Sequence, residues 1–484
     1  MSKDLDIEYI RPLDPRNAFF GGRTNASKLY YKCSEKERVK YCDFTSQYPW
    51  VNAFGEYPCY SFPTRILNNF DGQLNYNGFI KCRIVPPRGL YHPVLPDKIN
   101  NKTMFVLCKN CAEKGISVCR HSVEQRAFVG TWCIPEVKLV LSKGYVISQV
   151  YEVLHFENTG SDLFKDYIFT FLKIKQEASG YPKWCKNDDD RKKYIDDYKS
   201  KQGIRLDPAK IVYNEGLRLV AKLMLNSLWG KFGQKNNMRK HITINAEENP
   251  DEYYSIMFNA KYIVHDIVDY DNGRTLDLSY SLHKAAVRDD KNTSIFIAAY
   301  TTALAHCKLY SVLDTVGEKV LYYDTDSIIY VDDDIGSTEK TLPYGNYLGD
   351  LTDELKGDHI VEFVSGGAKN YSYILNKTGR AKTVCKGFTL SYENGLNLGH
   401  ESMKDIVFNP RYIDDEGIEK ESCVNFNFSE INISKTHSVR NKTKIIIPEK
   451  NNLPSKKYKF VYNKRVVQEF NSESKVIETL PFGF

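Results

Sequence analysis

The chain has 484 residues, 42% of them apolar and 26% charged, which is typical of a globular protein with a large core. Its 29 glycines and 18 prolines are too few for a fibrous or low-complexity chain. The 67 basic and 61 acidic side chains permit a polyanionic partner without demonstrating one. No signal segment or membrane-length apolar stretch is found, so we expect a soluble intracellular protein without a membrane partner, its compartment left open.

The first predicted elements are a glycine turn and a strand. A Gly-Gly pair at residues 21–22 follows two phenylalanines, and an apolar strand over residues 39–44 runs into a turn at residues 48–49. Residues 60–160 contain Asp-Gly and Asn-Gly pairs between β-branched and aromatic runs. We therefore expect this part of the chain to be rich in strands.

Four soft metal ligands lie within this β-rich part: Cys108, Cys111, Cys119 and His121. Tetrahedral Zn²⁺ suits three thiolates and an imidazole, and the opening C-x-x-C spacing is usual, but the closing C-x-H is tighter than in standard zinc fingers. Structural Zn²⁺ and reduced, unliganded thiols are therefore both open. The other members of the twelve cysteines are irregularly spaced and are interpreted as reduced thiols.

The middle of the chain predicts helices. One begins near residue 163, a second covers about residues 209–229 with Asp207 as N-cap, and a third covers residues 294–316. The charged stretch at 187–193 is interpreted as a solvated loop, and residues 240–292 as short strands and turns. Beyond them we expect a hairpin centred on residue 325 and strands at 444–447 and 458–462.

The expected hairpin, LYYDTDSIIY at residues 321–330, carries Asp324 and Asp326 two positions apart. On an extended backbone both carboxylates point to the same side, between residues that bury the rest of each strand. Burying like charges so close is costly unless a cation neutralises them, and Mg²⁺ prefers such oxygen ligands. A water-exposed acidic turn is the alternative interpretation.

A second acidic position, Asp43, lies at the end of the strand at 39–44. Alone, it is equally well a turn former or a helix cap. If it meets Asp326 in space, the two complete a two-metal clamp for an attacking and a leaving oxygen.

The helix expected at 209–229 has a polar face. The residues that share it, at spacings of three and four, are Glu215, Arg218, Lys222, Asn226 and Trp229. Arg218 and Lys222, one turn apart, suit a triphosphate, and an ordinary solvated face is the alternative. The residues expected to pack from the other faces are Val212, Leu219, Val220, Leu223 and Leu228.

Together these segments resemble family B DNA polymerases. Residues 43–49 (DFTSQYP) resemble motif A, DxxSLYP, with glutamine for leucine, and residues 222–230 (KLMLNSLWG) resemble motif B, KxxxNSxYG, with tryptophan for tyrosine. Residues 323–327 (YDTDS) match motif C, YxDTDS, and residues 369–371 (KNY) are similar to the downstream KxY motif. The order of the motifs is that of the family.

The resemblance narrows to the protein-primed branch of bacteriophages, linear plasmids and virus-like transposons, a class of mobile element. Residues 19–22 (FFGG) resemble the YxGG segment of that branch, with phenylalanine for tyrosine. Residues 163–166 (LFKD) are similar to the start of its fingers, and residues 479–484 (TLPFGF) to chain ends of transposon-encoded members. The similarity covers roughly residues 18–484.

The resemblance implies an α/β (α+β) fold, the right hand of palm, fingers and thumb. The implied parts, by position, are an N-terminal segment with the first part of the palm (1–60), an insertion resembling the first terminal-protein region plus palm strands (61–160), fingers (161–235), an insertion resembling the second terminal-protein region (236–292), palm (293–395) and thumb (396–484). Family members carry an exonuclease domain before the YxGG segment, so we expect a polymerase domain without proofreading, with Asp6 and Glu8 in a polar tail.

The same resemblance assigns roles to matching positions. The implied catalytic carboxylates, which bind two Mg²⁺ ions with Asp324 in support, are Asp43, Asp324 and Asp326. The residues implied to contact the incoming dNTP and the new base pair are Lys222, Arg218, Tyr48 (the steric gate against a ribose 2′-OH), Asn226, Ser227, Trp229 and Gly230. Those implied to contact DNA are Lys369, Tyr371, Gly21, Gly22 and Arg23.

The implied function is template-directed DNA synthesis in DNA replication. A primer 3′-OH, or a hydroxyl of a terminal priming protein at initiation, attacks the α-phosphorus of a dNTP, and pyrophosphate leaves. The partners are DNA template, primer and dNTPs. A catalytically inert DNA-binding relic is disfavoured by the intact carboxylates and Lys222, and a two-metal nuclease lacks a carboxylate set of its own.

Overall fold

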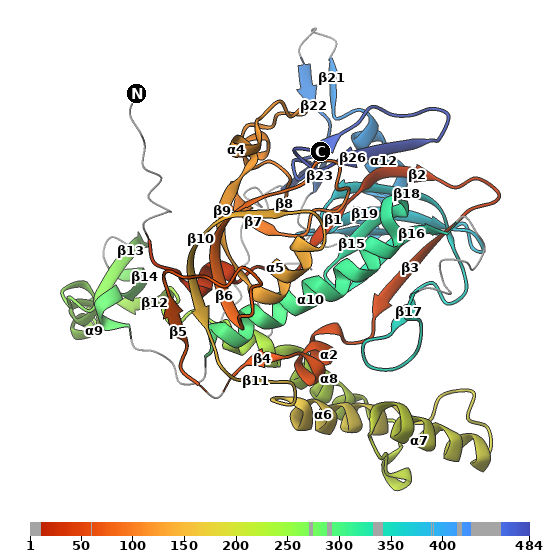
Figure 1. The fold of residues 1–484 in the computed structure, drawn as a ribbon, viewed down its shortest axis with the longest axis horizontal. Helices are drawn as coiled ribbons and strands as arrows, with labels where there is room; N and C mark the ends of the chain where they lie inside the picture. The colour runs from red at the N-terminus through yellow and green to blue at the C-terminus, as the bar shows by residue number, and fades with distance from the viewer. Residues whose placement is uncertain are drawn as a thin grey trace.

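The computed structural model describes residues 11–59, 61–270, 274–287, 293–332, 342–388, 390, 392–413, 419–426 and 456–484. A large sheet and the long helix α10 (Ile295–Val316) form the centre of the molecule, and a helical arm projects from one end (Figure 1). The architecture is mixed α/β, which confirms the predicted fold class at that level.

The central sheet has 11 strands, and its main path runs β1-β15-β16-β3-β18-β2-β26-β25. Beside this path, β17 pairs with β3, β19 with β18, and β20 with β19. The strands are β1 (Thr24–Ala26), β2 (Lys28–Lys32), β3 (Arg38–Phe44), β15 (Val320–Asp324), β16 (Ser327–Asp332), β17 (Leu351–Asp353), β18 (Ile360–Gly367), β19 (Asn370–Leu375), β20 (Ala381–Cys385), β25 (Val466–Val467) and β26 (Val476–Leu480). The predicted strand at 39–44 and the hairpin at 325 are both confirmed, and the hairpin lies between β1 and β3.

The part of the chain between β3 and α6 contains a second, four-stranded sheet in the order β5-β10-β6-β9 and two-stranded sheets of β7 with β8 and of β4 with β11. The strands of this part are β4 (Tyr57–Pro58), β5 (Thr64–Ile66), β6 (Gly78–Val85), β7 (Pro96–Ile99), β8 (Lys102–Phe105), β9 (Phe128–Cys133), β10 (Val146–His155) and β11 (Thr159–Gly160). The expected strand content is confirmed. Three short helices interrupt it: α3 (Lys109–Lys114), α4 (Val123–Arg126) and α5 (Ile134–Leu141).

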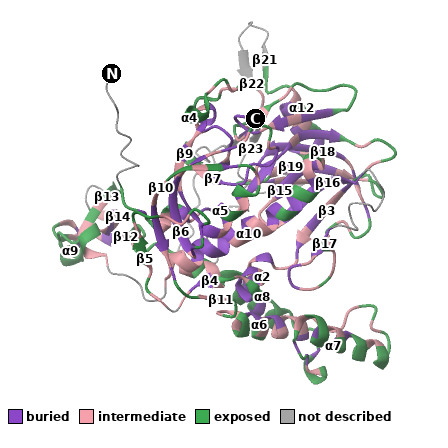
Figure 2. Cartoon of the chain, in the orientation of Figure 1, coloured by how far each residue is buried: buried purple, intermediate pink, exposed green. Residues whose placement is uncertain are grey.

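Helix α10 joins the two sheets. It is apolar on nearly all sides, which is the pattern of a helix buried in a core, and it is largely buried in Figure 2. Leu309 and Leu313 pack with residues of β3 and β16, while Ala299 and Tyr300 pack with residues of β6. The helix predicted at 294–316 is therefore confirmed, and it holds the central sheet against the second sheet.

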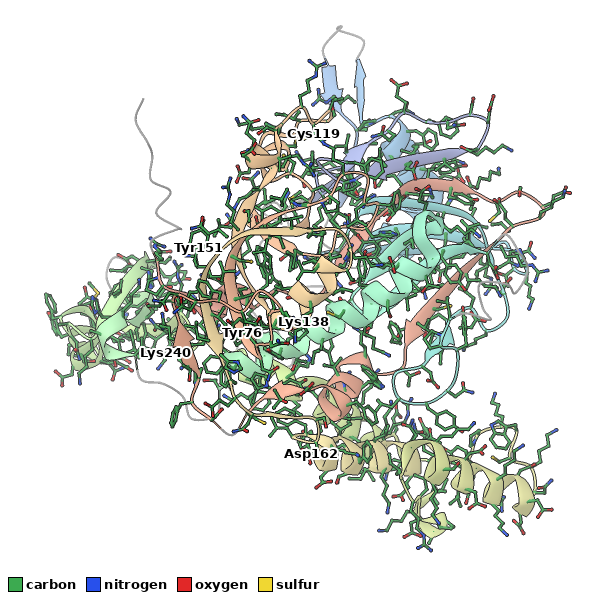
Figure 3. All side chains as sticks on the ribbon, in the orientation of Figure 1. Tyr76, Cys119, Lys138, Tyr151, Asp162 and Lys240 are labelled. Carbon is green, nitrogen blue, oxygen red and sulfur yellow. The ribbon has the colours of Figure 1, made fainter. Side chains whose placement is uncertain are left out.

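The projecting arm consists of α6 (Lys165–Glu177), α7 (Asp188–Gln202) and α8 (Glu215–Phe232). Asp162, labelled in Figure 3, lies where the arm joins the body, and its carbonyl accepts a hydrogen bond from Lys165 N at the start of α6. The prediction of a loop at 187–193 is wrong, because this charged stretch begins α7. Its N-cap Asn187 accepts a hydrogen bond from Asp190 N (2.8 Å), and three aspartates in the first turn suit the positive end of the helix dipole.

Helix α8 begins later than predicted. Asp207 caps only a 3₁₀ turn, η2 (Pro208–Lys210), and Asn214 caps α8 through Leu217 N (3.0 Å). The predicted packing of the apolar residues is also wrong for most of them, since only Ala221 and Leu225 of this helix are buried. The predicted core residues that are exposed are Val212, Leu219, Val220 and Leu223. Helix α8 packs on α6 and, near its C-terminal end, on α2 and α10, and its buried residues Ala221 and Leu225 form a single i,i+4 row.

The remaining elements belong neither to the two larger sheets nor to the arm. Residues 240–282 form β12 (Lys240–Asn245), α9 (Pro250–Met257), β13 (Tyr262–Asp269) and β14 (Thr275–Leu282), which confirms the predicted strands. Further along are α2 (Gln47–Phe54) beside the central sheet, α11 (Tyr392–Asn397), α12 (His400–Phe408), β21 (Arg411–Ile413), β22 (Glu419–Glu421), β23 (Cys423–Phe426) and β24 (Lys456–Lys459). The strand predicted at 458–462 is only partly present, because β24 ends at Lys459. The strand predicted at 444–447, like Asp6 and Glu8, lies outside the described residues.

The segment 466–480 returns to the central sheet, where β26 pairs with β2. The sequence pattern did not predict this return, because five-residue strands carry little periodicity of their own. Among the helices of the described ranges, none has both the length and the apolarity that crossing a bilayer requires.

Candidate active site

The three predicted catalytic carboxylates come together at the β15–β16 turn. Asp324 is the last residue of β15, Asp326 lies in the turn, and Asp43 on β3 is directly opposite Ser327 of β16. Phe44 N donates to Asp326 O (2.7 Å), which fixes the turn against β3. The predicted meeting of Asp43 with the hairpin is thus present in the fold.

Asp324 and Asp326 do not lie on one continuous extended strand, as the sequence had led us to expect, because β15 ends at Asp324. Thr325 between them has a φ of 62°, the left-handed region, so the strand alternation is broken at the turn. Thr325 N donates to Arg23 O (2.8 Å), and Asp326 N donates to Asp324 O (2.6 Å). As a result the two carboxylates have different surroundings.

The pKa values of the Asp43 and Asp326 carboxyl groups are both raised. Burial, followed by the charges of Asp326, Glu354 and Asp324, raises the pKa of Asp43 to about 8. Burial and then the charge of Asp324 raise the pKa of Asp326 to about 6. No described side chain donates a hydrogen bond to either carboxylate, so together they offer oxygen ligands that a divalent cation would stabilise.

Asp324, by contrast, is already partnered. Lys369 Nζ donates to both of its carboxylate oxygens (2.9 and 2.8 Å). Thr24 Oγ1 and Thr325 Oγ1 donate to Oδ1 (2.6 and 3.1 Å). Asp324 therefore anchors β1, the hairpin and β19 to one another, which fits the supporting position expected for it.

Asp43 and Asp326 face a pocket of about 420 Å³. The residues that line it are Asp43, Phe44, Ser46, Gln47, Tyr48, Pro49, Lys222, Asn226, Trp229 and Asp326. The Tyr48 ring is stacked on Trp229, with ring centroids 4.5 Å apart and planes at 19°. Gln47, which replaces the usual leucine, is buried, and its amide donates to Ala305 O on α10 (2.9 Å). The pocket thus combines residues from three distant segments.

The polar face predicted for α8 is confirmed for Lys222, Asn226 and Trp229, which point into this pocket. Ser227 and Gly230 are exposed on α8 and are not among the pocket residues. Arg218 lies one turn away from the pocket, where its Nε donates to Ser179 Oγ (3.1 Å). Only part of the predicted nucleotide set therefore lines the pocket.

Lys175 of α6 is a basic residue that the sequence did not single out. Its pKa is lowered by burial and then by the charges of Arg218 and Lys222. Lys175, Arg218 and Lys222, from two helices, thus lie close enough beside the pocket to repel one another. Such a concentration of positive charge is what an anion-binding site requires. Lysines are common on surface helices, so the sequence alone gives no sign of this role. Lys175 is recognised only because α6 packs beside α8 in the fold.

Comparison with known proteins places this chain in a family. Residues 14–318 match the family described as DNA polymerase type B, organellar and viral. The chain belongs to this family. No curated protein matches the chain at a significant level.

Solved structures of phi29 DNA polymerase have the same fold as this family B chain. The match to the complex with single-stranded DNA has a TM-score of 0.53 at 16% sequence identity. It covers 82% of this chain and 60% of the phi29 polymerase chain. The match to the ternary complex with primer-template DNA and incoming nucleotide substrates has a TM-score of 0.53 at 18% sequence identity. It covers 83% of this chain and 58% of the phi29 polymerase chain. The family B chain described here thus spans about three fifths of the phi29 polymerase that it matches.

The predicted DNA contacts of the family B chain are unequally exposed. Lys369 is half-exposed, whereas the Tyr371 ring is only 7% exposed and its hydroxyl lies 3.3 Å from that of Tyr41. Lys464 was not predicted. Its Nζ donates to Thr24 O (3.2 Å), and burial with nearby lysines lowers its pKa to about 8. A basic group thus lies beside Asp324, far in sequence from every motif.

The glycine segment supports the hairpin of the family B chain. The Arg23 side chain is 1% exposed, with its guanidinium 4.2 Å from the centroid of the Phe105 ring. Its burial does not support a direct DNA contact through that side chain, and its carbonyl instead holds Thr325. Gly21 is exposed, and Gly22 packs on Thr325.

Gly22→Ala is expected to lower the thermal stability of the protein. A Cβ at this position would lie 2.3 Å from Thr325 Oγ1, so the turn that carries Asp326 must move. Overpacking of this kind costs about 1–3 kcal/mol. Gly21→Ala is the matched control, because no heavy atom lies within 4 Å of its Cβ position. Equal unfolding midpoints of the two variants would contradict the prediction.

Proposed function

We propose that this chain is a template-directed DNA polymerase that adds deoxynucleotides to a primer 3′-OH. The observation that carries the proposal is the pocket in which Asp43 and Asp326 face Lys222, Asn226 and the stacked Tyr48 and Trp229. Membership in family B and the fold of phi29 polymerase support the same function.

In this proposal Asp43 and Asp326 hold Mg²⁺. Two half-buried carboxylates with raised pKa values and no described side-chain hydrogen-bond donor form the oxygen-rich, negatively charged set that this ion fits. When bound, Mg²⁺ lowers the pKa of the primer hydroxyl and neutralises charge on the triphosphate. Asp324 keeps the hairpin in place through its bonds to Thr24 and Lys369.

The other pocket residues bind and orient the nucleotide. Lys222, with Lys175 and Arg218 behind it, supplies positive charge for the triphosphate. The Tyr48–Trp229 stack offers a flat apolar surface for the sugar and base, and in this proposal Tyr48 is the steric gate against a ribose 2′-OH. In this proposal Asn226 borders the new base pair, and Ser227 and Gly230, which are exposed on the same helix, contact that base pair too.

We propose the right-hand arrangement of palm, fingers and thumb on the same basis. The central sheet that carries the carboxylates serves as palm, the α6–α8 arm as fingers, and the described segments after residue 396 as thumb, apart from β25 and β26 in the palm sheet. Residues 61–160 and 236–292 take the places of the two terminal-protein regions. The phi29 complexes contain primer-template DNA and nucleotides, and we propose the same partners here, with a priming protein at initiation.

The test is primer extension by the purified chain on primed single-stranded DNA with Mg²⁺ and either dNTPs or rNTPs. Extension with dNTPs and much slower use of rNTPs is the expected result. If the folded chain binds the primed template in a salt-sensitive way but extends nothing, the inert relic replaces this proposal. A nuclease would instead shorten the primer.

A further inference from the structure

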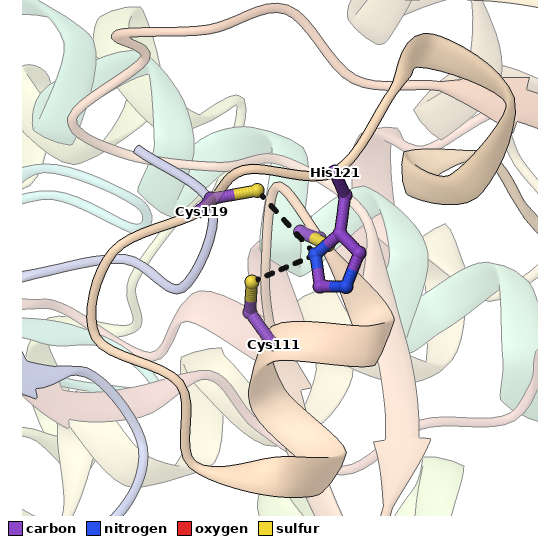
Figure 4. A group of neighbouring side chains, drawn as sticks. Cys111, Cys119 and His121 are labelled. Atoms are coloured by element: carbon purple, nitrogen blue, oxygen red, sulfur yellow. Dashed lines mark hydrogen bonds between the residues drawn. The ribbon is translucent and has the colours of Figure 1, made fainter.

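Cys108, Cys111, Cys119 and His121 converge at one point. Cys108 directly precedes α3, Cys111 lies within it, and the other two lie in the loop before α4. Their ligand atoms all lie within 4.8 Å of one another, and Figure 4 shows the sulfur atoms of Cys111 and Cys119 directed at the His121 ring. The distances from His121 Nδ1 to the three Sγ atoms are 3.4, 3.2 and 3.7 Å, in chain order.

These distances suit a shared metal ion better than thiol hydrogen bonds. Zn–S bonds of about 2.3 Å and Zn–N bonds of about 2.05 Å at a tetrahedral angle place N and S about 3.6 Å apart. A single Nδ1 can accept only one hydrogen bond in its plane, yet three sulfur atoms lie around it. All three cysteines are free of disulfide bonds.

We propose that these four residues bind a structural Zn²⁺ ion. Three thiolates and one imidazole complete a tetrahedral shell and leave no open position for substrate. The site is remote from the proposed catalytic pocket, because Cys119 lies on the opposite side of the molecule from the α6–α8 arm (Figure 3).

The surroundings stabilise the negative charge that three thiolates leave on such a site. The buried Arg126 lies within electrostatic range of all three cysteines, and its Nη2 donates to the carbonyls of Pro86 and Pro87. Arg88 Nη2 donates to His121 O (3.0 Å), which holds the loop that carries two of the ligands. Such outer contacts orient metal ligands.

The ion also fixes a distant segment. Phe482 O accepts hydrogen bonds from Leu107 N (2.8 Å) and Cys108 N (3.0 Å), and the Phe482 ring packs with Cys108 and Cys111. At Gly483, with a φ of 92°, a Cβ would lie 2.5 Å from Cys108 Cβ. This segment continues β26, which pairs with β2. The segment 108–121, which carries the four proposed zinc ligands, therefore connects the central sheet to the β7–β8 region.

The first experiment measures metal in the full chain, purified under reducing conditions without chelator and equilibrated with Zn²⁺. About one equivalent is expected, reduced at least about fivefold in Cys111→Ser and His121→Ala because each loses a ligand. Cys59→Ser is the matched control, since Cys59 lies outside the group. Co²⁺ in place of Zn²⁺ is expected to give thiolate charge-transfer absorption and tetrahedral d–d bands.

The second experiment measures hydrogen exchange with and without the metal. Removal of Zn²⁺ is expected to speed exchange at Leu107 and Cys108 and in peptides covering residues 476–484, but not in β12–β14. Less than about a tenth of an equivalent of zinc in the native chain, or equal loss in Cys59→Ser, would overturn the site. Bound zinc with unchanged exchange at 476–484 would overturn the anchoring role. Neither measurement depends on polymerase activity.

Discussion

Asp326→Asn is expected to reduce primer extension by about 10³-fold or more, equivalent to about 4 kcal/mol of transition-state stabilisation. The substitution keeps the size of the side chain but removes a negative oxygen ligand from the pocket. Asp43 would then be the one carboxylate left among the described residues that line the pocket. Single-nucleotide incorporation under saturating dNTP measures the rate, and gel-shift titration checks that DNA affinity is retained.

Asp324→Asn provides an internal comparison. Its carboxylate accepts hydrogen bonds from Lys369, Thr24 and Thr325, so the loss should be smaller, about 10–100-fold. Asp314→Asn is the control, because Asp314 is an exposed α10 residue paired with Lys143 (2.6 Å) away from the pocket. Equal losses for Asp324→Asn and Asp326→Asn would contradict the different roles assigned to them.

Stability provides a check that a loss of activity is not misfolding. Because the pKa of Asp326 is about 6 in the folded chain and near 4 when unfolded, the folded state binds more protons between these values. Metal-free stability should therefore fall as pH rises through this window, and Asn should remove the part of the fall that Asp326 contributes, while Asp43, whose pKa is also raised, continues to contribute. Asp326→Asn is expected to be at least as stable as the native chain at pH 8 without Mg²⁺.

The sequence predicted the site better than its surroundings. Motif order placed Asp43, Lys222 and Asp326 in one site because each motif keeps its local structure: a strand end, a helix face and a hairpin turn. The hydrogen bonds from Lys369 and Thr24 to Asp324 depend on which strands pair. No local pattern encodes a pairing across 300 residues.

The errors on the arm have a different cause. At 187–193 the density of charge suggested a loop, but an asparagine cap and acidic first turn make the same residues a good helix start. On α8, hydrophobicity suggested burial, yet Leu219 and Leu223 are exposed because the arm has few elements to cover them. On a projecting arm, the number of neighbouring helices and strands decides which apolar side chains are buried. The hydrophobic periodicity of the sequence does not contain that information.

Lys222→Ala is expected to lower kcat/KM for the incoming dNTP by about 100-fold, equivalent to about 2.7 kcal/mol. Lys222 lines the pocket, and its charge lowers the pKa of Asp43 against the effect of burial. Its ammonium is the cation best placed for the triphosphate, with Lys175 and Arg218 adding to the field. The loss should appear as a higher KM for the dNTP and also as a lower kcat at saturating dNTP, because charge builds on the phosphates during transfer.

Lys231→Ala separates this role from the general effect of positive charge on DNA binding. Lys231 lies near the other end of α8, where its Nζ donates to Gln234 Oε1 (2.8 Å), and it does not line the pocket. Its removal should leave dNTP use within about twofold of the native chain. If both variants lose the same activity, or if raising the DNA concentration restores Lys222→Ala, the lysine acts on the template and not on the nucleotide. A KM effect confined to Lys222→Ala would connect the pocket geometry directly to nucleotide binding.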